Sequence, residues 1–138
     1  MTTINQRAIG ACFCGNVNFS VQLPVKWCAH CHCTMCRRIH GAAFVTWFGV
    51  NDGEHRIDER DVIWYQSSAD AERGRCRHCA TPMFFRSKRW PGELHIALAT
   101  MKAPIDLKPQ CHVFYADAVD WLEWHDELPR YATVASEG

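Results

Sequence analysis

Cysteine motifs are where this sequence concentrates side chains that can bind a metal. Two pairs lie far apart in the chain, CFC at residues 12–14 and CRHC at residues 76–79. Each pair can present two thiolates from a tight turn, and four thiolates complete the tetrahedral coordination of a structural zinc. Gly15 fits such a turn, because a residue without a Cβ lets backbone amides face the sulfurs. The alternative is a set of four buried core thiols. We predict a closed zinc site whose ligands are Cys12, Cys14, Cys76 and Cys79.

A second cluster, CHCTMC at residues 31–36, brings three thiols within six consecutive residues. Three protein ligands leave the fourth position of a zinc ion to water or to an incoming thiol, which is typical of catalytic zinc. The alternative is a fourth protein ligand that closes the site, and the candidates nearby are His30, His32, His40 and Cys28. We predict a second, open zinc site formed by Cys31, Cys33 and Cys36, and therefore two zinc ions per chain.

Arginines flank both cysteine clusters. Arg37 and Arg38 directly follow the second cluster, where two cations beside an open metal could attract a carboxylate-bearing ligand. Glutathione is such a ligand, because it has a thiol for the metal and carboxylates for the arginines. Around the CRHC motif, at positions 73, 75 and 77, three further arginines offset the charge of the first site or are solvated. Cys28 and Cys111 have no role that the sequence supports, and Cys111 is expected to be a buried thiol in a strand.

The elements that must position these motifs are mostly β-strands. Alternating or continuous apolar residues predict strands at 17–21, 44–50, 62–66, 83–86, 94–99 and 112–115. Short helical turns are expected only at 34–40 and 118–124. Many short strands with long connections bury a modest core, so metal ions that join distant segments would add stability.

Composition limits the class of protein. The chain has 138 residues, enough for one domain, which we place at residues 1–132 with a tail at 133–138. Equal numbers of acidic and basic residues, 15 each, argue against a nucleic-acid partner. We expect neither a signal peptide nor a membrane span, because no apolar run is long enough. Nine cysteines without an export signal favour metal binding in the cytoplasm over disulfides.

Three ordered cysteine motifs and their neighbours resemble one known family. The matching segments are 10–15 (GACFCG), 31–38 (CHCTMCRR), 41–42 (GA) with Phe44, 65–68 (YQSS), Arg73 and 76–82 (CRHCATP), followed by His112, Trp121 and 126–131 (DELPRY). The chain resembles the glutathione-dependent formaldehyde-activating enzyme family, which also includes centromere protein V. Three positions depart from the family pattern. Ala80 stands where glycine is usual, Arg75 where an aromatic residue is usual, and 101–104 (MKAP) where Leu-Asp-x-Pro is common.

The resemblance implies a β-rich fold similar to Mss4, with short antiparallel sheets tied by zinc and with the same division of the seven cysteines between two ions. It implies formation of S-hydroxymethylglutathione from glutathione and formaldehyde, which is carbon–sulfur lyase chemistry. The rival interpretation is a non-catalytic zinc- or thiol-binding module like Mss4. A zinc-ribbon nucleic-acid binder is a weaker rival, since the chain has no net charge.

Overall fold

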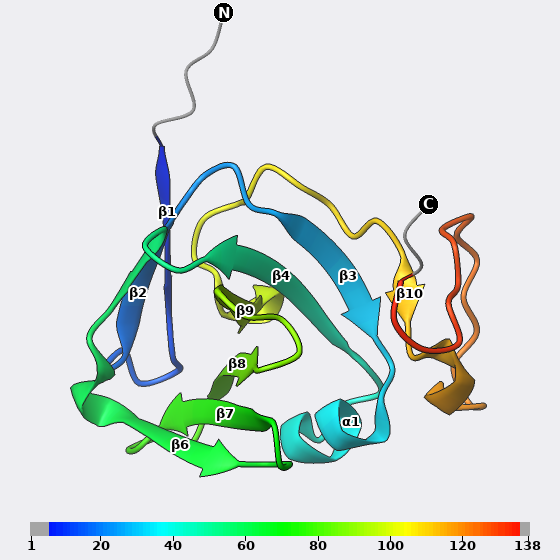
Figure 1. The fold of residues 1–138 in the computed structure, drawn as a ribbon, viewed down its shortest axis with the longest axis horizontal. Coiled ribbons are helices and arrows are strands. Elements are labelled where there is room, and N and C mark those ends of the chain that lie inside the picture. Colours follow the sequence, from blue (N-terminus) through cyan, green and yellow to red (C-terminus); the bar gives the residue numbers. More distant parts are fainter. Residues whose placement is uncertain (1–5, 136–138) are drawn as a thin grey trace, which may run out of the picture.

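Ten β-strands and one short α-helix form the part of the chain that the computed structural model describes, residues 6–135 (Figure 1). The strands are β1 (Arg7–Ala11), β2 (Asn18–Gln22), β3 (Trp27–Cys31), β4 (Val45–Asn51), β5 (His55–Ile57), β6 (Val62–Gln66), β7 (Ala71–Cys76), β8 (Pro82–Ser87), β9 (Glu93–Ala97) and β10 (His112–Val113). The helix is α1 (Thr34–His40), and three 3-10 turns are η1 (Glu59–Asp61), η2 (Leu98–Thr100) and η3 (Tyr115–Asp117). The prediction of a mostly β fold is confirmed.

Two sheets share the strands. The larger sheet has the order β10-β3-β4-β9-β8-β7-β6 and is antiparallel except where β10 runs parallel to β3. The smaller sheet has the order β1-β2-β5. Figure 1 shows the large sheet curving from β3 and β4 down to β7 and β6, with β1 and β2 at its side. The core lies between the sheets, where the rings of Phe19 and Phe84 meet edge to face with centroids 5.3 Å apart.

Several predicted elements agree with the structure, and one does not. Residues 62–66 form β6, and residues 34–40 form α1. The predicted helical turn at 118–124 is wrong: these residues form no helix, and the 3-10 turn η3 ends just before them. Trp121 in this segment is 72% exposed, so a helix here would have no apolar face packed on the sheet. The sequence also missed β1, β3, β5 and β7.

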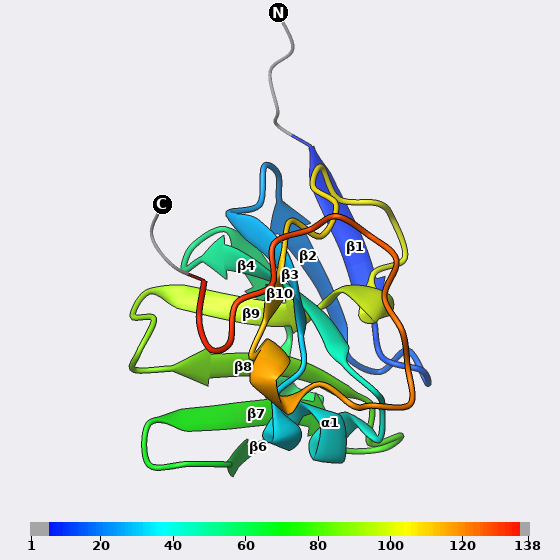
Figure 2. The ribbon, with the colours of Figure 1, turned by 90° about the vertical axis from the view of Figure 1, so that its right-hand side faces the viewer.

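The segment that follows β10 runs beside β3 and β10, where Figure 2 shows it in orange and red in front of these strands. Its backbone is tied to β10, because His112 N donates to Pro129 O at 2.9 Å and Tyr131 N donates to His112 O at 2.9 Å. Phe114 N donates to Thr133 O at 2.7 Å, so the first residue of the predicted tail is hydrogen-bonded to the fold. Residues 136–138 of that tail lie outside the described residues.

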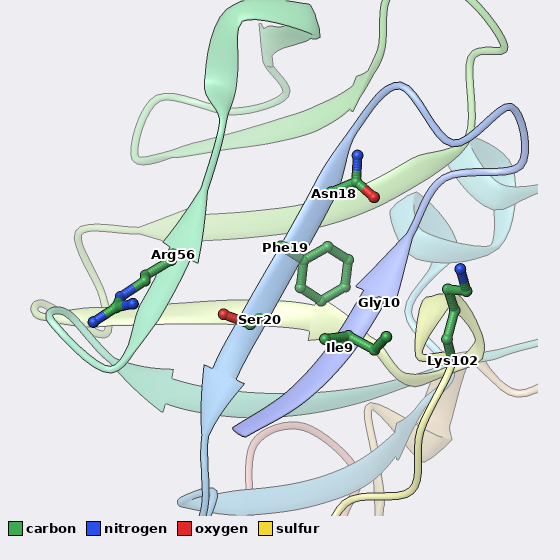
Figure 3. Close-up of a pocket in the computed structure, with 7 residues that line it drawn as sticks. All are labelled: Ile9, Gly10, Asn18, Phe19, Ser20, Arg56 and Lys102. Atoms are coloured by element: carbon green, nitrogen blue, oxygen red, sulfur yellow. The ribbon is translucent and has the colours of Figure 1, made fainter. Parts of the chain in front are cut away.

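A cavity of about 310 Å³ lies against β1 and β2 (Figure 3). The Phe19 ring fills the space beside Gly10, where a Cβ would come within 2.3 Å of the ring. Among residues 6–135, its charged lining residues are Arg56 and Lys102, and no cysteine, histidine or carboxylate lines it. The cavity therefore offers no side chain that is typical of a zinc site. Within residues 6–135, no helix has the length and apolar character that crossing a bilayer requires.

Candidate metal centres

The first cysteine set comes together between the turn that precedes β2 and the turn that follows β7. The Sγ atom of Cys14 lies 3.6 Å from that of Cys12 and 3.7 Å from that of Cys76, and the four sulfurs, including Cys79, lie within 4.8 Å of one another. Sulfurs at about 2.3 Å from a tetrahedral zinc are separated by about 3.8 Å, whereas a disulfide requires about 2 Å. All nine cysteines are free. The spacing fits a four-thiolate metal site.

Backbone amides surround the sulfurs of this first site. Val17 N donates to Cys12 Sγ at 3.3 Å, and His78 N donates to Cys76 Sγ at 3.3 Å. The turns need left-handed backbone, since Gly15 has φ 85° and Ala80 has φ 65°. The expectation for Gly15 therefore agrees with its conformation, and Ala80 adopts a conformation that favours glycine. These turns aim amide N–H groups at the sulfurs, an arrangement that suits metal-bound thiolates.

The second cysteine set is built by the end of β3 and the start of α1. Cys31 is the last residue of β3, Cys33 is the N-cap of α1, and Cys36 lies in the first turn of the helix. The Cys31 and Cys36 sulfurs are 3.7 Å apart, and Cys36 N donates to Cys33 Sγ at 3.3 Å. Cys31 and Cys36 are buried, whereas Cys33 is half-buried. The spacing again fits a tetrahedral metal, with three sulfurs.

The candidates for a fourth ligand have other surroundings. His30 Nδ1 lies 2.8 Å from Thr46 Oγ1, and the His40 ring packs edge to face on Trp47. Cys28 belongs to the main core, where burial and then the charge of Cys111 raise its pKa to about 11. In residues 6–135, no fourth Cys, His, Asp or Glu joins the three-cysteine group within 4.8 Å. The described chain therefore offers three candidate ligand atoms at this site, all of them sulfurs.

Cys111 is half-buried and precedes β10, so it does not lie inside a strand as expected.

His32 belongs to a buried hydrogen-bond chain and is not part of the three-cysteine group. Its Nε2 lies 2.8 Å from His112 Nδ1, and His112 Nε2 lies 2.9 Å from Asp126 Oδ2. The two imidazoles are 1% and 0% exposed. Burial lowers the pKa of His32 to about 4. Sequence reasoning assigned no role to His112 or Asp126, although both belong to the C-terminal residues quoted above.

Arg73 on β7 lies against the second site, although its position in the sequence suggested the first. Its guanidinium donates from Nη1 to Cys36 Sγ at 3.5 Å and from Nε to Ser67 Oγ at 3.2 Å. Hydrogen bonds from Cys31 and Cys33, and the charge of Arg73, lower the pKa of Cys36. The arrangement therefore favours a thiolate at Cys36.

Arg37 and Arg38 line a second cavity, of about 260 Å³, at the C-terminal end of α1. The indole of Trp121 and the side chain of Val119 form another part of its wall. Arg37 Nη1 donates to Asp117 O at 2.8 Å, which holds one guanidinium in place, and Arg38 is exposed. The two arginines thus share one cavity, and they directly follow Cys36 in the sequence of α1.

Comparisons with known proteins agree with this arrangement. The model of the family described as glutathione-dependent formaldehyde-activating enzyme matches residues 7–117. A protein of Halomonas elongata with the provisional name glutathione-dependent formaldehyde-activating enzyme is 26% identical over 125 residues, which cover 83% of this chain and 78% of that protein. The crystal structure of a Rhodobacter sphaeroides protein, 20% identical, superposes with a TM-score of 0.60 over 89% of this chain and 98% of that one, which supports the fold. Because the family model spans most of the chain and includes all seven clustered cysteines, the chain belongs to the glutathione-dependent formaldehyde-activating enzyme family.

Proposed function

We propose that this protein is a zinc-dependent enzyme that joins a small thiol to a small aldehyde, with glutathione and formaldehyde as substrates. The observation that carries the proposal is the set Cys31, Cys33 and Cys36, in which three thiols gather without a fourth protein ligand in the described chain. A site of this type has room for one ligand from outside the protein. Cys12, Cys14, Cys76 and Cys79 would hold a structural zinc.

Zinc, when bound by the three thiols, would lower the pKa of an additional thiol and so make a thiolate available near neutral pH. The chain's own residues would bind and orient the substrates. Arg37 and Arg38 would receive glutathione carboxylates, because both line one cavity and directly follow Cys36 along α1. Trp121 in the same wall would cover the apolar stem of the peptide. Holding the thiol and the aldehyde close together supplies much of the rate.

The proposed reaction is an addition. The glutathione sulfur forms a bond to the formaldehyde carbon, the carbonyl π bond breaks, and the carbonyl oxygen takes up the proton lost from the thiol. The product is S-hydroxymethylglutathione, and the reverse reaction breaks a carbon–sulfur bond, which places the activity in the carbon–sulfur lyase class. Reducing conditions suit seven unoxidised cysteines at two metal sites, and we therefore keep the cytoplasm as the proposed location.

Calorimetric titration with glutathione tests the proposal. We expect the zinc-loaded parent to bind glutathione and Cys33→Ala to lose most of that affinity. Cys111→Ala is the matched control, because this cysteine lies outside both clusters, and it should bind as the parent does. Formaldehyde is then added, and formation of the adduct is followed by NMR. If Cys33→Ala binds glutathione as tightly as the parent, thiol binding at this site is wrong. If the parent binds glutathione without accelerating adduct formation, the protein is a binding module.

A further inference from the structure

Arg73 is a buried cation with an unusual set of neighbours. It is 6% exposed on β7, and its guanidinium carbon lies 4.7 Å from the centre of the Phe85 ring. Its two hydrogen-bond acceptors are Ser67 Oγ and Cys36 Sγ. Within residues 6–135, no carboxylate forms an ion pair with Arg73. A buried charge without a counter-ion is strongly destabilising. The cysteine group beside it must therefore supply the negative charge.

The charge of the second site matches this need. Three thiolates around one divalent ion leave a net charge of about −1, which a single guanidinium neutralises. A fourth thiolate, the ligand expected from a substrate, would add another negative charge in a partly buried place. The pair of Arg73 and Cys36 therefore reduces the electrostatic cost of binding an anionic thiol.

The contact is also selective among the three cysteines. In the part of the chain that the structure describes, Arg73 donates to Cys36 Sγ, whereas Cys33 Sγ accepts from the backbone N–H of Cys36. A charge-assisted hydrogen bond holds the Cys36 sulfur in one orientation and offsets part of the negative charge that three thiolates gather around a metal.

Both the edge and the flat face of the Arg73 guanidinium make contacts. Nε is held by Ser67, Nη1 reaches Cys36, and the flat face lies over Phe85. A lysine has the charge but neither the planar fork nor the stacking face. The guanidinium is thus held in place before any ligand arrives.

We propose that Arg73 is a positioning residue of the three-cysteine site, which serves as the fixed counter-charge of its thiolates and sets how readily the site accepts a further thiolate. The proposal rests on the metal-binding part of the proposed function and goes beyond it, because it assigns a role to the Ser67–Arg73–Cys36 chain. The role is exerted through Cys36 and not through contact with the substrate.

Metal binding tests it without reference to catalysis. Cobalt(II) and zinc affinities of both sites, and the thiolate-to-cobalt charge-transfer spectrum, are measured for the parent, Arg73→Met, Arg73→Lys and Ser67→Ala. Arg75→Met is the matched control, since Arg75 lies on the same strand but is exposed. We expect Arg73→Met to lose about 10- to 100-fold in affinity at the second site, with a shifted charge-transfer band, and to keep the first site. The metal affinities of the second site in Arg73→Lys and Ser67→Ala should lie between those of Arg73→Met and the parent. Glutathione affinity should follow the same order.

The outcomes separate the two proposals. If Arg73→Met, Arg73→Lys and Ser67→Ala all hold the second ion within twofold of the parent, with an unchanged spectrum, the role of Arg73 is wrong and the proposed function is unaffected. If the parent binds two ions but no glutathione, thiol binding is wrong, and the metal affinities alone decide the role of Arg73. A parent that binds one ion overturns both. If Arg73→Met loses the fold, Ser67→Ala and Arg73→Lys decide the question.

Discussion

His32 Nε2 and His112 Nδ1 lie 2.8 Å apart, although the two residues are 80 positions apart in the chain. This contact joins the cysteine-rich segment to the C-terminal segment, and Asp126 extends it by accepting from His112 Nε2. With the carboxylate as acceptor, His112 Nε2 carries the proton and His112 Nδ1 accepts from His32. The C-terminal segment therefore fixes the orientation of a side chain that lies between Cys31 and Cys33.

Asp126→Ala should destabilise the protein. The change leaves the His112 N–H buried without an acceptor and also removes the acceptor of Leu128 N, which lies 2.9 Å from Asp126 Oδ1. We expect the free energy of unfolding to fall by about 1–3 kcal/mol in urea titrations. Glu127→Ala is the control, because Glu127 is exposed, and it should change stability by less than about 0.5 kcal/mol. Equal effects of the two substitutions would contradict a structural role for the hydrogen-bond chain.

Protonation of His32 should destabilise the fold at mildly acidic pH. Burial, with smaller contributions from His112, His30, Arg130 and Arg37, lowers its pKa to about 4, below about 6.5 in the unfolded chain. The unfolded state therefore binds more protons between these values, so stability is fully present above pH about 6.5 and falls as pH drops towards 4. We expect this group to contribute a loss of about 1 kcal/mol between pH about 7.5 and about 5.5.

Urea titrations at both pH values, in excess zinc, measure the effect in the parent, His32→Asn and His125→Gln. His32→Asn should show a smaller pH dependence than the parent. His125 is exposed, so His125→Gln should retain the parent's pH dependence. The same dependence in all three proteins would show that His32 is not the group responsible.

Ala80→Gly should stabilise the protein. Ala80 has φ 65° in the turn after Cys79, where a side chain with a Cβ costs about 1–2 kcal/mol. The residue is exposed, so loss of its methyl group removes little packing. Glycine has more conformational freedom than alanine in the unfolded chain, which offsets part of the relieved strain. We therefore expect the free energy of unfolding to rise by about 1 kcal/mol. Ala69→Gly, at an exposed loop position outside the left-handed region, should give no gain. A loss of stability in Ala80→Gly would contradict the conformation seen here.

Cysteine spacing predicted both clusters, but the strands that position them were partly missed. β3 (WCAHC) and β7 (AERGRC) bury cysteine, alanine, glycine and arginine, so neither shows the alternation of large apolar residues that identifies a strand. β6, in contrast, was predicted with its bounds because its β-branched and aromatic residues form one run. The contact of Arg73 with Cys36 joins residues 37 positions apart, and no local pattern encodes it. It depends on how β7 and α1 pack in the finished fold.

Loss of the first cysteine site should affect stability far more than loss of the second. Cys14 and Cys76 are 62 positions apart, and Cys76 is fully buried in the main core, so a metal there closes a long loop. Cys31, Cys33 and Cys36 lie within one short segment, and a metal there restrains little additional chain. We therefore expect Cys76→Ser to lower the free energy of unfolding by at least about 3 kcal/mol, and Cys33→Ser by less than about 1 kcal/mol.

Zinc content and urea midpoints, measured on the same samples before and after a mild chelator, check this difference. One zinc per chain should leave the parent readily without a change in secondary structure, and Cys33→Ser should already lack it. The zinc of the four-cysteine site should leave only when the protein unfolds. Its ligands come from turns that the fold holds together through contacts such as the hydrogen bond from Phe13 N to Thr81 Oγ1 at 3.1 Å. Two equally resistant ions would contradict an open three-cysteine site, and equal midpoints for Cys33→Ser and Cys76→Ser would contradict a structural role for the four-cysteine site.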